Sequence, residues 1–247
     1  MYKRQIVQGL GNVGYYAAKF LSDEDGAKVT HVIERDGSIV NHKGIDISSL
    51  KKHLIVKGTI KGFNGFIEAG AEILEEEADI LIPAAMELVI NEENANRIKV
   101  PLIVEAANGP VSSSADEILN QRGVIIIPDL YANAGGVTVS YFEWIKNLSR
   151  IRLGRLQRRA QENQVSTLIN GIERMTGKDF PSDIKSKSIQ GLSELDLVRS
   201  GLEDTMIETY NVISNVWNSN EDIPDLRTAA MMVSIKRIAQ SYSSLGI

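Results

Sequence analysis

Short apolar runs recur through the first half of the chain, and segments with helical periodicity lie between them. Continuous apolar runs bounded by turn residues are typical of buried strands in a parallel sheet. The expected strands are 5–8, 28–33, 79–82, 102–104 and 124–127. The expected helices between them are 12–23, 46–56, 91–97 and 113–122. This alternation predicts an α/β fold with a doubly wound, mostly parallel sheet.

The pattern changes after Asn133, because no further strand-like run follows it. Helices are expected at about 134–148, 150–174, 195–217 and 225–245, with a polar, loop-like segment at 175–194. The segment from 150 to 194 therefore looks like an insertion with its own outline, and two more helices follow it.

Residues that favour helix starts and strand ends stand at several of these boundaries. Helix 113–122 is expected to open on a capping box that begins at Ser114, and the last helix is expected to start near Pro224 and Asp225. Pro83 and Pro128 directly follow predicted strands. Because ligands bind at the carboxyl edge of open α/β sheets, the loops after these prolines are candidate walls of a site.

Composition excludes several classes of function. Hydrophobic residues make up 43% of the chain, and the formal net charge of −5 disfavours a nucleic-acid partner. No apolar stretch is long enough for a membrane span, and no targeting segment is expected before the first strand. The absence of cysteine excludes disulfides and thiolates. His31, His42 and His53 lack the paired spacing of metal ligands, so no metal site is expected.

A glycine pattern directly follows the first predicted strand. Gly9, Gly11 and Gly14 form Gly-x-Gly-x-x-Gly and lead into an apolar helix, which is the order of a dinucleotide-binding fingerprint. The second predicted strand ends on Glu34, twenty residues after Gly14, where an acidic side chain can hold ribose hydroxyls. These positions predict a nucleotide site, although Glu34 could also merely end a strand.

Two later loops carry further candidate chemistry. The small residues around Asn108 leave space for a ring, and the Asn108 amide can donate and accept hydrogen bonds, which suits a nicotinamide carboxamide or a ribose. A second small, polar turn at 129–136 opens a helix whose free backbone N–H groups could hold an anion such as a substrate carboxylate.

Four motifs follow one another along the chain. They are Val7-Gln8-Gly9-Leu10-Gly11-Asn12-Val13-Gly14, Asp79-Ile80-Leu81-Ile82-Pro83-Ala84-Ala85, Ala107-Asn108-Gly109-Pro110, and Ile127-Pro128-Asp129-Leu130 continuing to Trp144. Together they resemble the nucleotide-binding half of glutamate dehydrogenase. The resemblance continues through Asp225-Leu226-Arg227-Thr228-Ala229-Ala230 and covers essentially the whole chain. It implies a Rossmann-like dinucleotide-binding domain at 1–147, an antenna-like insertion at 148–196, and a pivot helix and C-terminal helix at 197–247.

The same resemblance implies a role for individual residues. Ala84 and Ala85 would flank the cofactor, and Asn108 and Asn133 would orient its nicotinamide end. The pyrophosphate would be held by Gly9, Gly11, Asn12, Val13 and Gly14, and the adenosine ribose by Glu34. Val137 and Ser140 would contact the side-chain end of glutamate, although from its residues alone Ser140 is more simply a helix-surface hydroxyl.

The implied reaction is the reversible oxidative deamination of L-glutamate to 2-oxoglutarate and ammonium, with NAD as hydride acceptor. Glu34 favours NAD over NADP by repelling a 2′-phosphate, but the neighbouring Arg35 could soften that choice, so NADP stays an alternative.

The resemblance also implies what surrounds this chain. The family's N-terminal domain, which carries its catalytic lysine, has no counterpart in these 247 residues, so the chain alone is expected to be inactive. The intact protein would be a homo-hexamer, located in the mitochondrial matrix if eukaryotic and in the cytoplasm otherwise. The alternative is a stand-alone, non-catalytic module that binds a nucleotide or supports assembly.

Overall fold

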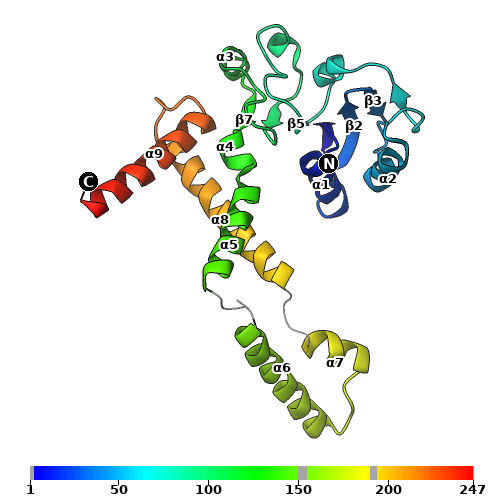
Figure 1. The fold of residues 1–247 in the computed structure, drawn as a ribbon, viewed down its shortest axis with the longest axis vertical. Coiled ribbons are helices and arrows are strands. Elements are labelled where there is room, and N and C mark those ends of the chain that lie inside the picture. Colours follow the sequence, from blue (N-terminus) through cyan, green and yellow to red (C-terminus); the bar gives the residue numbers. More distant parts are fainter. Residues whose placement is uncertain (1–2, 150–154, 190–193, 247) are drawn as a thin grey trace. The chain divides into compact units, whose positions relative to one another are not determined.

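The computed structural model describes residues 3–149, 155–189 and 194–246 (Figure 1). The chain divides into two compact units, which are described separately below. The first comprises Met1–Ala134 and Asn211–Ile247, and the second comprises Gly135–Tyr210. The boundaries lie within helices and differ from the predicted ones at 147 and 196, so the three-part division remains a prediction.

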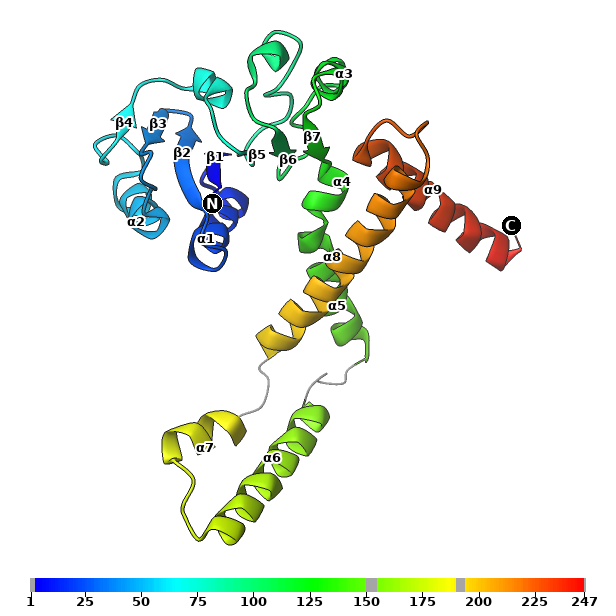
Figure 2. The ribbon, with the colours of Figure 1, turned by 180° about the vertical axis from the view of Figure 1, so that it is seen from behind.

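A seven-stranded sheet forms the centre of the first unit, in the order β4-β3-β2-β1-β5-β6-β7 (Figure 2). The four pairs β2·β1, β1·β5, β5·β6 and β6·β7 are parallel. The pairs β2·β3 and β3·β4, at one edge of the sheet, are antiparallel. This arrangement confirms the mostly parallel α/β fold. The strands are β1 (Arg4–Gln8), β2 (Lys28–Glu34), β3 (Gly37–Val40), β4 (Phe66–Ile67), β5 (Ile80–Pro83), β6 (Leu102–Val104) and β7 (Ile125–Ile127).

All five predicted strands are present, but β3 and β4 were not predicted. β2 and β3 form a hairpin around Arg35 and Asp36, and Gly37 follows with φ 138°. Asp-Gly between two strand-like runs is a hairpin signal that the pattern of apolar runs alone does not reveal.

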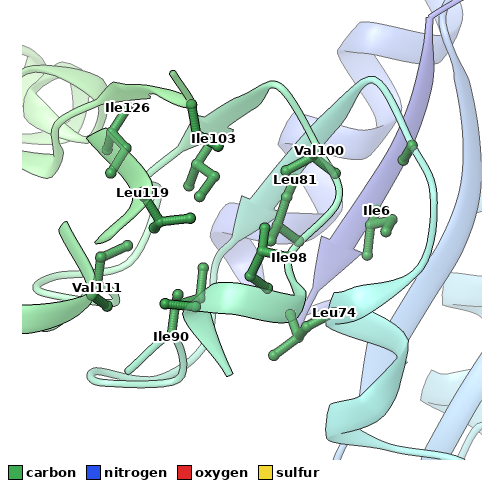
Figure 3. Packing of buried hydrophobic residues seen from close by; sticks show 14 of the residues in the cluster. Ile6, Leu74, Leu81, Ile90, Ile98, Val100, Ile103, Val111, Leu119 and Ile126 are labelled. Carbon is green, nitrogen blue, oxygen red and sulfur yellow. The ribbon is translucent and has the colours of Figure 1, made fainter. Parts of the chain in front are cut away.

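Buried side chains lie on both faces of the sheet, because successive strand residues point in opposite directions. Ile6 belongs to one cluster and Val7 to the other. The first cluster includes Leu81, Ile103 and Ile126 and is drawn in Figure 3. Buried residues of α1 (Asn12–Asp23) and α2 (Ile47–Lys57) join the Val7 cluster, and buried residues of α3 (Ser113–Gln121) join the Ile6 cluster. Helices therefore cover both faces, as a doubly wound sheet requires.

Two local predictions in this unit are wrong. Segment 91–97 contains only a short 3-10 helix, η2 (Ala95–Arg97). The Asn91 side chain accepts from the Glu93 N–H and the Asn94 side chain from the Asn91 N–H, and such contacts compete with helical hydrogen bonds. The N-cap of α3 is Ser112, whose hydroxyl accepts from the Ala115 N–H, whereas Ser114 donates to Glu92.

Three further helical segments complete the first unit. A 3-10 helix, η1 (Ala71–Glu75), precedes β5, and a short helix, α4 (Asp129–Ala132), follows β7. The last helix, α9 (Leu226–Leu245), is capped by Asp225, which accepts from the Thr228 N–H, so its predicted start is confirmed. Its N-terminal turns pack with α4, β7 and the end of α8 around Ile213, Leu226 and Ala229.

The second unit is helical in its described residues. Its helices are α5 (Ala134–Ser149), α6 (Arg155–Thr176), α7 (Ser182–Ile189) and α8 (Glu194–Ser219), the last of which continues into the first unit. The predicted start of helix 150–174 lies outside the described residues.

The prediction of a loop at 175–194 is wrong, because α7 occupies much of that segment. Proline is tolerated at a helix start, and Pro181 directly precedes α7 rather than breaking it. Glu173 of α6 holds α7 through an ion pair with Lys185 at 2.9 Å and a hydrogen bond from the Phe180 N–H. No helix among the described residues is long and apolar enough to cross a membrane.

Candidate functional site

The glycine turn connects the end of β1 to α1. Gly9 has φ 85°, and its N–H donates to the Ile33 carbonyl at 2.7 Å. A Cβ on Gly9 would lie 2.7 Å from the Ala85 Cβ, and a Cβ on Gly14 would lie 1.9 Å from the Gly9 carbonyl oxygen. Both glycines are therefore required by close packing, as the fingerprint predicts.

Gly11 differs from the other two glycines, because a Cβ built on it would have no atom within 4 Å. Gly11 is also the N-cap of α1, so no side chain caps the first backbone N–H groups of that helix. The exposed residues Asn12 and Val13 follow directly. Open space beside uncapped N–H groups at a helix N-terminus fits the pyrophosphate of a dinucleotide.

Glu34 lies beside this turn, at the end of β2. Its carboxylate Oε1 accepts from the Leu10 N–H at 2.5 Å, and the side chain is half-buried. On the other side of the same residue, the Lys51 ammonium donates to the Leu10 carbonyl at 2.7 Å. The structure thus brings Glu34 and the glycine turn together, and the second carboxylate oxygen is left for other partners.

The loop after β5 lies next to the turn because β5 pairs directly with β1. The Ala84 N–H donates to the Gln8 carbonyl at 2.9 Å, and Ala85 lies against Gly9. This pair of strands is also where the chain changes its direction of winding across the sheet, which is the usual ligand position in open α/β folds.

Asn108 and Asn133 are joined directly, although they follow different strands. The Asn133 amide donates to the Asn108 Oδ1 at 2.6 Å. The loop that carries Asn108 is tied to the neighbouring loop, since the N–H groups of Ala106 and Ala107 both donate to the Pro83 carbonyl. The two predicted nicotinamide residues therefore stand together at the same carboxyl edge of the sheet.

An ion network that the sequence did not reveal is connected to this pair by backbone hydrogen bonds of Gly109 and Asn133 to Asp129. Arg227, in the first turn of α9, contacts Glu105, Asp116 and Asp129, and Glu105 is fully buried. Burial raises the pKa of Glu105 and of Asp116. Burial acts against the charge of Arg227, but Glu105 and Asp116 outweigh it and raise its pKa.

Two signals in the sequence point to these residues. Glu105 directly follows an apolar strand that neutral residues would continue, and Arg227 stands at a helix start, where the helix dipole disfavours a cation. Each signal is local, however, and neither indicates that the two side chains meet.

Val137 and Ser140 lie on α5 in the second unit. Val137 is 75% exposed, and the Ser140 hydroxyl donates to the Gly136 carbonyl at 3.1 Å. In this structure the hydroxyl therefore bonds its own helix, and the substrate role remains a prediction. Tyr141 and Trp144 are more than half exposed and stack on each other.

Comparison with known proteins agrees with this geometry. The sequence model of the glutamate/leucine/phenylalanine/valine dehydrogenase family matches residues 1–178. A probable glutamate dehydrogenase of Sinorhizobium fredii is 50% identical over 95% of this chain and 53% of its own length. The mitochondrial glutamate dehydrogenase of Dictyostelium discoideum is 45% identical over 99% of this chain and 48% of its own length.

Solved structures show the same relationship. The glutamate dehydrogenase of Peptoniphilus asaccharolyticus, at 27% identity and a TM-score of 0.67, is matched over 98% of this chain and 47% of its own. A hetero-hexameric glutamate dehydrogenase of Thermus thermophilus, at 21% identity and a TM-score of 0.74, is matched over 99% and 48% and shares the fold. The chain spans about half the length of the curated relatives that it matches. It belongs to the glutamate/leucine/phenylalanine/valine dehydrogenase family.

Proposed function

We propose that this chain is the cofactor-binding portion of a glutamate dehydrogenase. The whole enzyme would interconvert L-glutamate with 2-oxoglutarate and ammonium. Two curated relatives at 45% identity or more are named as glutamate dehydrogenases, which supports glutamate over the other substrates in the family's name. The chain covers about half of each, so the catalytic lysine domain would lie in the other half, and this chain alone would be inactive.

The observation that carries the cofactor proposal is the open space at Gly11 between two tightly packed glycines. Gly9, Gly11, Asn12, Val13 and Gly14 would hold the pyrophosphate, because the helix start offers N–H groups there. Asn108 and Asn133 would hold the carboxamide and ribose of the nicotinamide end, and Ala84 and Ala85 would flank it. The nicotinamide, when bound, accepts the hydride.

Glu34 would select the adenosine ribose. With one carboxylate oxygen taken by the Leu10 N–H, the other can accept a ribose hydroxyl, and its charge repels a 2′-phosphate. NAD is therefore proposed as the preferred cofactor. Arg35 is exposed next to Glu34 and is the residue that could admit NADP.

Substrate contact is proposed for Val137 and Ser140. The Ser140 hydroxyl would have to exchange the Gly136 carbonyl for the distal carboxylate of glutamate, which requires only rotation of its side chain.

Assembly and location are also part of the proposal. The helices of 148–196 would form the antenna of a homo-hexamer, and α6 exposes Leu168, Ile172 and Met175 at helical spacing for contacts between subunits. A mitochondrial location is supported by the name of the Dictyostelium relative, and a cytoplasmic location is the alternative.

Calorimetric titration of the 247-residue chain with NAD and NADP tests the cofactor proposal. We expect NAD to bind more tightly than NADP. Glu34→Gln should reduce the ratio of the two affinities by roughly tenfold, since it removes the charge but keeps an acceptor for the Leu10 N–H. Glu68→Gln, at an exposed site, is the control and should change neither affinity. Failure of the unaltered chain to bind either cofactor would contradict the proposal.

The alternative function is a non-catalytic nucleotide-binding or assembly module. The exposed surface of α9 distinguishes it from the dehydrogenase proposal. This helix exposes an apolar stripe that runs from its middle to its end and consists of Met231, Ile235, Ile238, Tyr242 and Leu245. Apolar patches of this kind mark contact surfaces, so the stripe favours docking of the other half of the dehydrogenase.

A further inference from the structure

Arg227 binds carboxylates from three separate segments. Its Nη2 lies 2.8 Å from the Glu105 Oε1 and its Nη1 lies 3.0 Å from the Glu105 Oε2, which makes this contact bidentate. Its Nε lies 3.0 Å from the Asp116 Oδ2, and its Nη1 also lies 3.5 Å from the Asp129 Oδ1. One side chain of α9 thereby joins the loop after β6, helix α3 and the start of α4.

Hydrogen bonds lead from these carboxylates to the asparagine pair. The Glu105 Oε2 accepts from the Asp129 N–H at 2.8 Å, and the Asp129 Oδ2 accepts from the Gly109 N–H at 2.8 Å. Gly109 directly follows Asn108, and the Asn133 N–H donates to the Asp129 carbonyl at 3.1 Å. Both asparagines are therefore linked to Asp129, Asn108 through its neighbour Gly109 and Asn133 through its own N–H. Asp129 is in turn held by Glu105 and Arg227.

The charges make this arrangement depend on Arg227. Glu105, Asp116 and Asp129 gather around a single guanidinium, and Glu105 is fully buried. Without the cation, the carboxylates of Glu105 and Asp129 would repel each other, and a buried charge without a partner is strongly unfavourable. The loops after β6 and β7 would then separate, and the Asn108–Asn133 hydrogen bond would be lost.

We propose that Arg227 is a positioning residue, which sets the nicotinamide end of the cofactor site by holding Glu105 and Asp129, to which the loops of the Asn108–Asn133 pair are hydrogen-bonded. The inference rests on the proposed function, because it assigns the nicotinamide end to that pair. The adenosine end is held differently, by the glycine turn and Glu34, whose hydrogen bonds to Ile33 and Leu10 involve none of the network residues. Arg227 therefore affects one end of the cofactor and not the other.

Comparison of two ligands separates positioning from general stability. NAD carries the nicotinamide and its ribose, whereas ADP keeps only the adenosine and the two phosphates. For Arg227→Met in the 247-residue chain, we expect calorimetry to show about a tenfold loss of NAD affinity and less than about a twofold change for ADP. A general loss of structure would weaken both ligands.

Arg97→Met is the matched control. Arg97 also makes a bidentate contact, with Glu75 at 2.7 Å for both bonds, but it is exposed and lies outside the site loops. It should change neither affinity. If Arg227→Met does not fold, as judged by circular dichroism, Arg227→Lys keeps the charge without the planar fork and should still weaken NAD selectively, by about threefold.

Equal losses of both ligands, or no loss of NAD affinity, would overturn the positioning role. Failure of the unaltered chain to bind ADP as well as NAD would instead count against the proposed cofactor site itself. The two failures are thus distinguishable in one set of titrations.

Discussion

The three glycines of the turn have different physical reasons to be glycine. Gly14 is closed off by the Gly9 carbonyl, so it serves the packing of helix against strand. Gly11 has φ −66°, which any residue can adopt, and has open space where a Cβ would stand. Its lack of a side chain therefore benefits a bound ligand rather than the fold.

This difference predicts that alanine at one position affects stability and alanine at the other affects NAD binding. Gly14→Ala should destabilise the chain by about 1–3 kcal/mol, because the new methyl group overlaps a backbone oxygen. Gly11→Ala should change stability by less than about 0.5 kcal/mol but weaken NAD binding by roughly tenfold, because the methyl group occupies the place proposed for the pyrophosphate. Urea denaturation and calorimetry measure the two effects. Tight NAD binding by Gly11→Ala would contradict the assignment of that space.

At the scale of elements, helix α2 carries both a side-chain N-cap and a lysine that contacts the glycine turn. Asp46 caps the helix, since its carboxylate accepts from the Ser49 N–H at 2.9 Å and from the Ser49 hydroxyl at 2.7 Å. Lys51, one turn further along, donates to the Leu10 carbonyl in the glycine turn. A well-formed first turn of α2 therefore keeps Lys51 in place.

The cap should make a pH-dependent contribution to stability. Hydrogen bonds from the Ser49 side chain, and then from its backbone N–H, lower the pKa of Asp46. A lowered pKa in the folded state means that the contribution is present above the unfolded value near 4 and is lost as the pH falls through the folded value.

Asp46→Ala should accordingly cost about 1 kcal/mol at neutral pH. The difference from the unaltered chain should shrink at about pH 2.5, which is well below the unfolded pKa near 4, because the contribution of the Asp46 charge is lost progressively as the pH falls. Asp25→Ala, at an exposed position after α1, serves as the control for loss of one surface carboxylate. Urea denaturation at both pH values measures the effect, and an equal cost at both would show that the carboxylate charge plays no part in the cap.

At the scale of the whole molecule, the apolar stripe of α9 predicts association with the other half of the dehydrogenase. The part of the Sinorhizobium relative that this chain does not match is a suitable partner, because the chain matches 53% of that protein at 50% identity. Alone, the 247-residue chain should give no glutamate-dependent reduction of NAD. Together with that half, it should form a complex and gain activity.

Substitution within the stripe provides the specific test of this association. Ile235 is 64% exposed, so Ile235→Asp should leave the folded chain intact but weaken the complex by about tenfold or more in size-exclusion and calorimetric measurements. Lys236→Asp, at the next and also exposed position, is the matched control. A complex that tolerates Ile235→Asp would show that another surface is used, and a chain active alone would overturn the half-enzyme proposal.

The elements that the sequence predicted correctly are those with a strong local pattern. The five parallel strands are apolar on both faces, so they appear as continuous runs, and Asp225 marks the start of α9 through its own capping hydrogen bond. β3, α7 and the turn at 91–94 were missed or wrong because these segments are short and contain too few consecutive apolar residues to form a run. Contacts elsewhere decide them, such as Lys185 with Glu173 for α7.

The sequence by itself determined the sheet class, the glycine turn and the position of Glu34, since each depends on spacings within a few dozen residues. Only the tertiary structure decided which distant residues meet. Arg227 and Glu105 lie 122 positions apart, and Asn133 reaches Asn108 across 25. These pairings arise because parallel strands bring the ends of β6 and β7 to one edge of the sheet, where α9 packs beside β7. Strand order and helix packing are long-range outcomes of burying apolar surface, and the local pattern of a chain does not specify them.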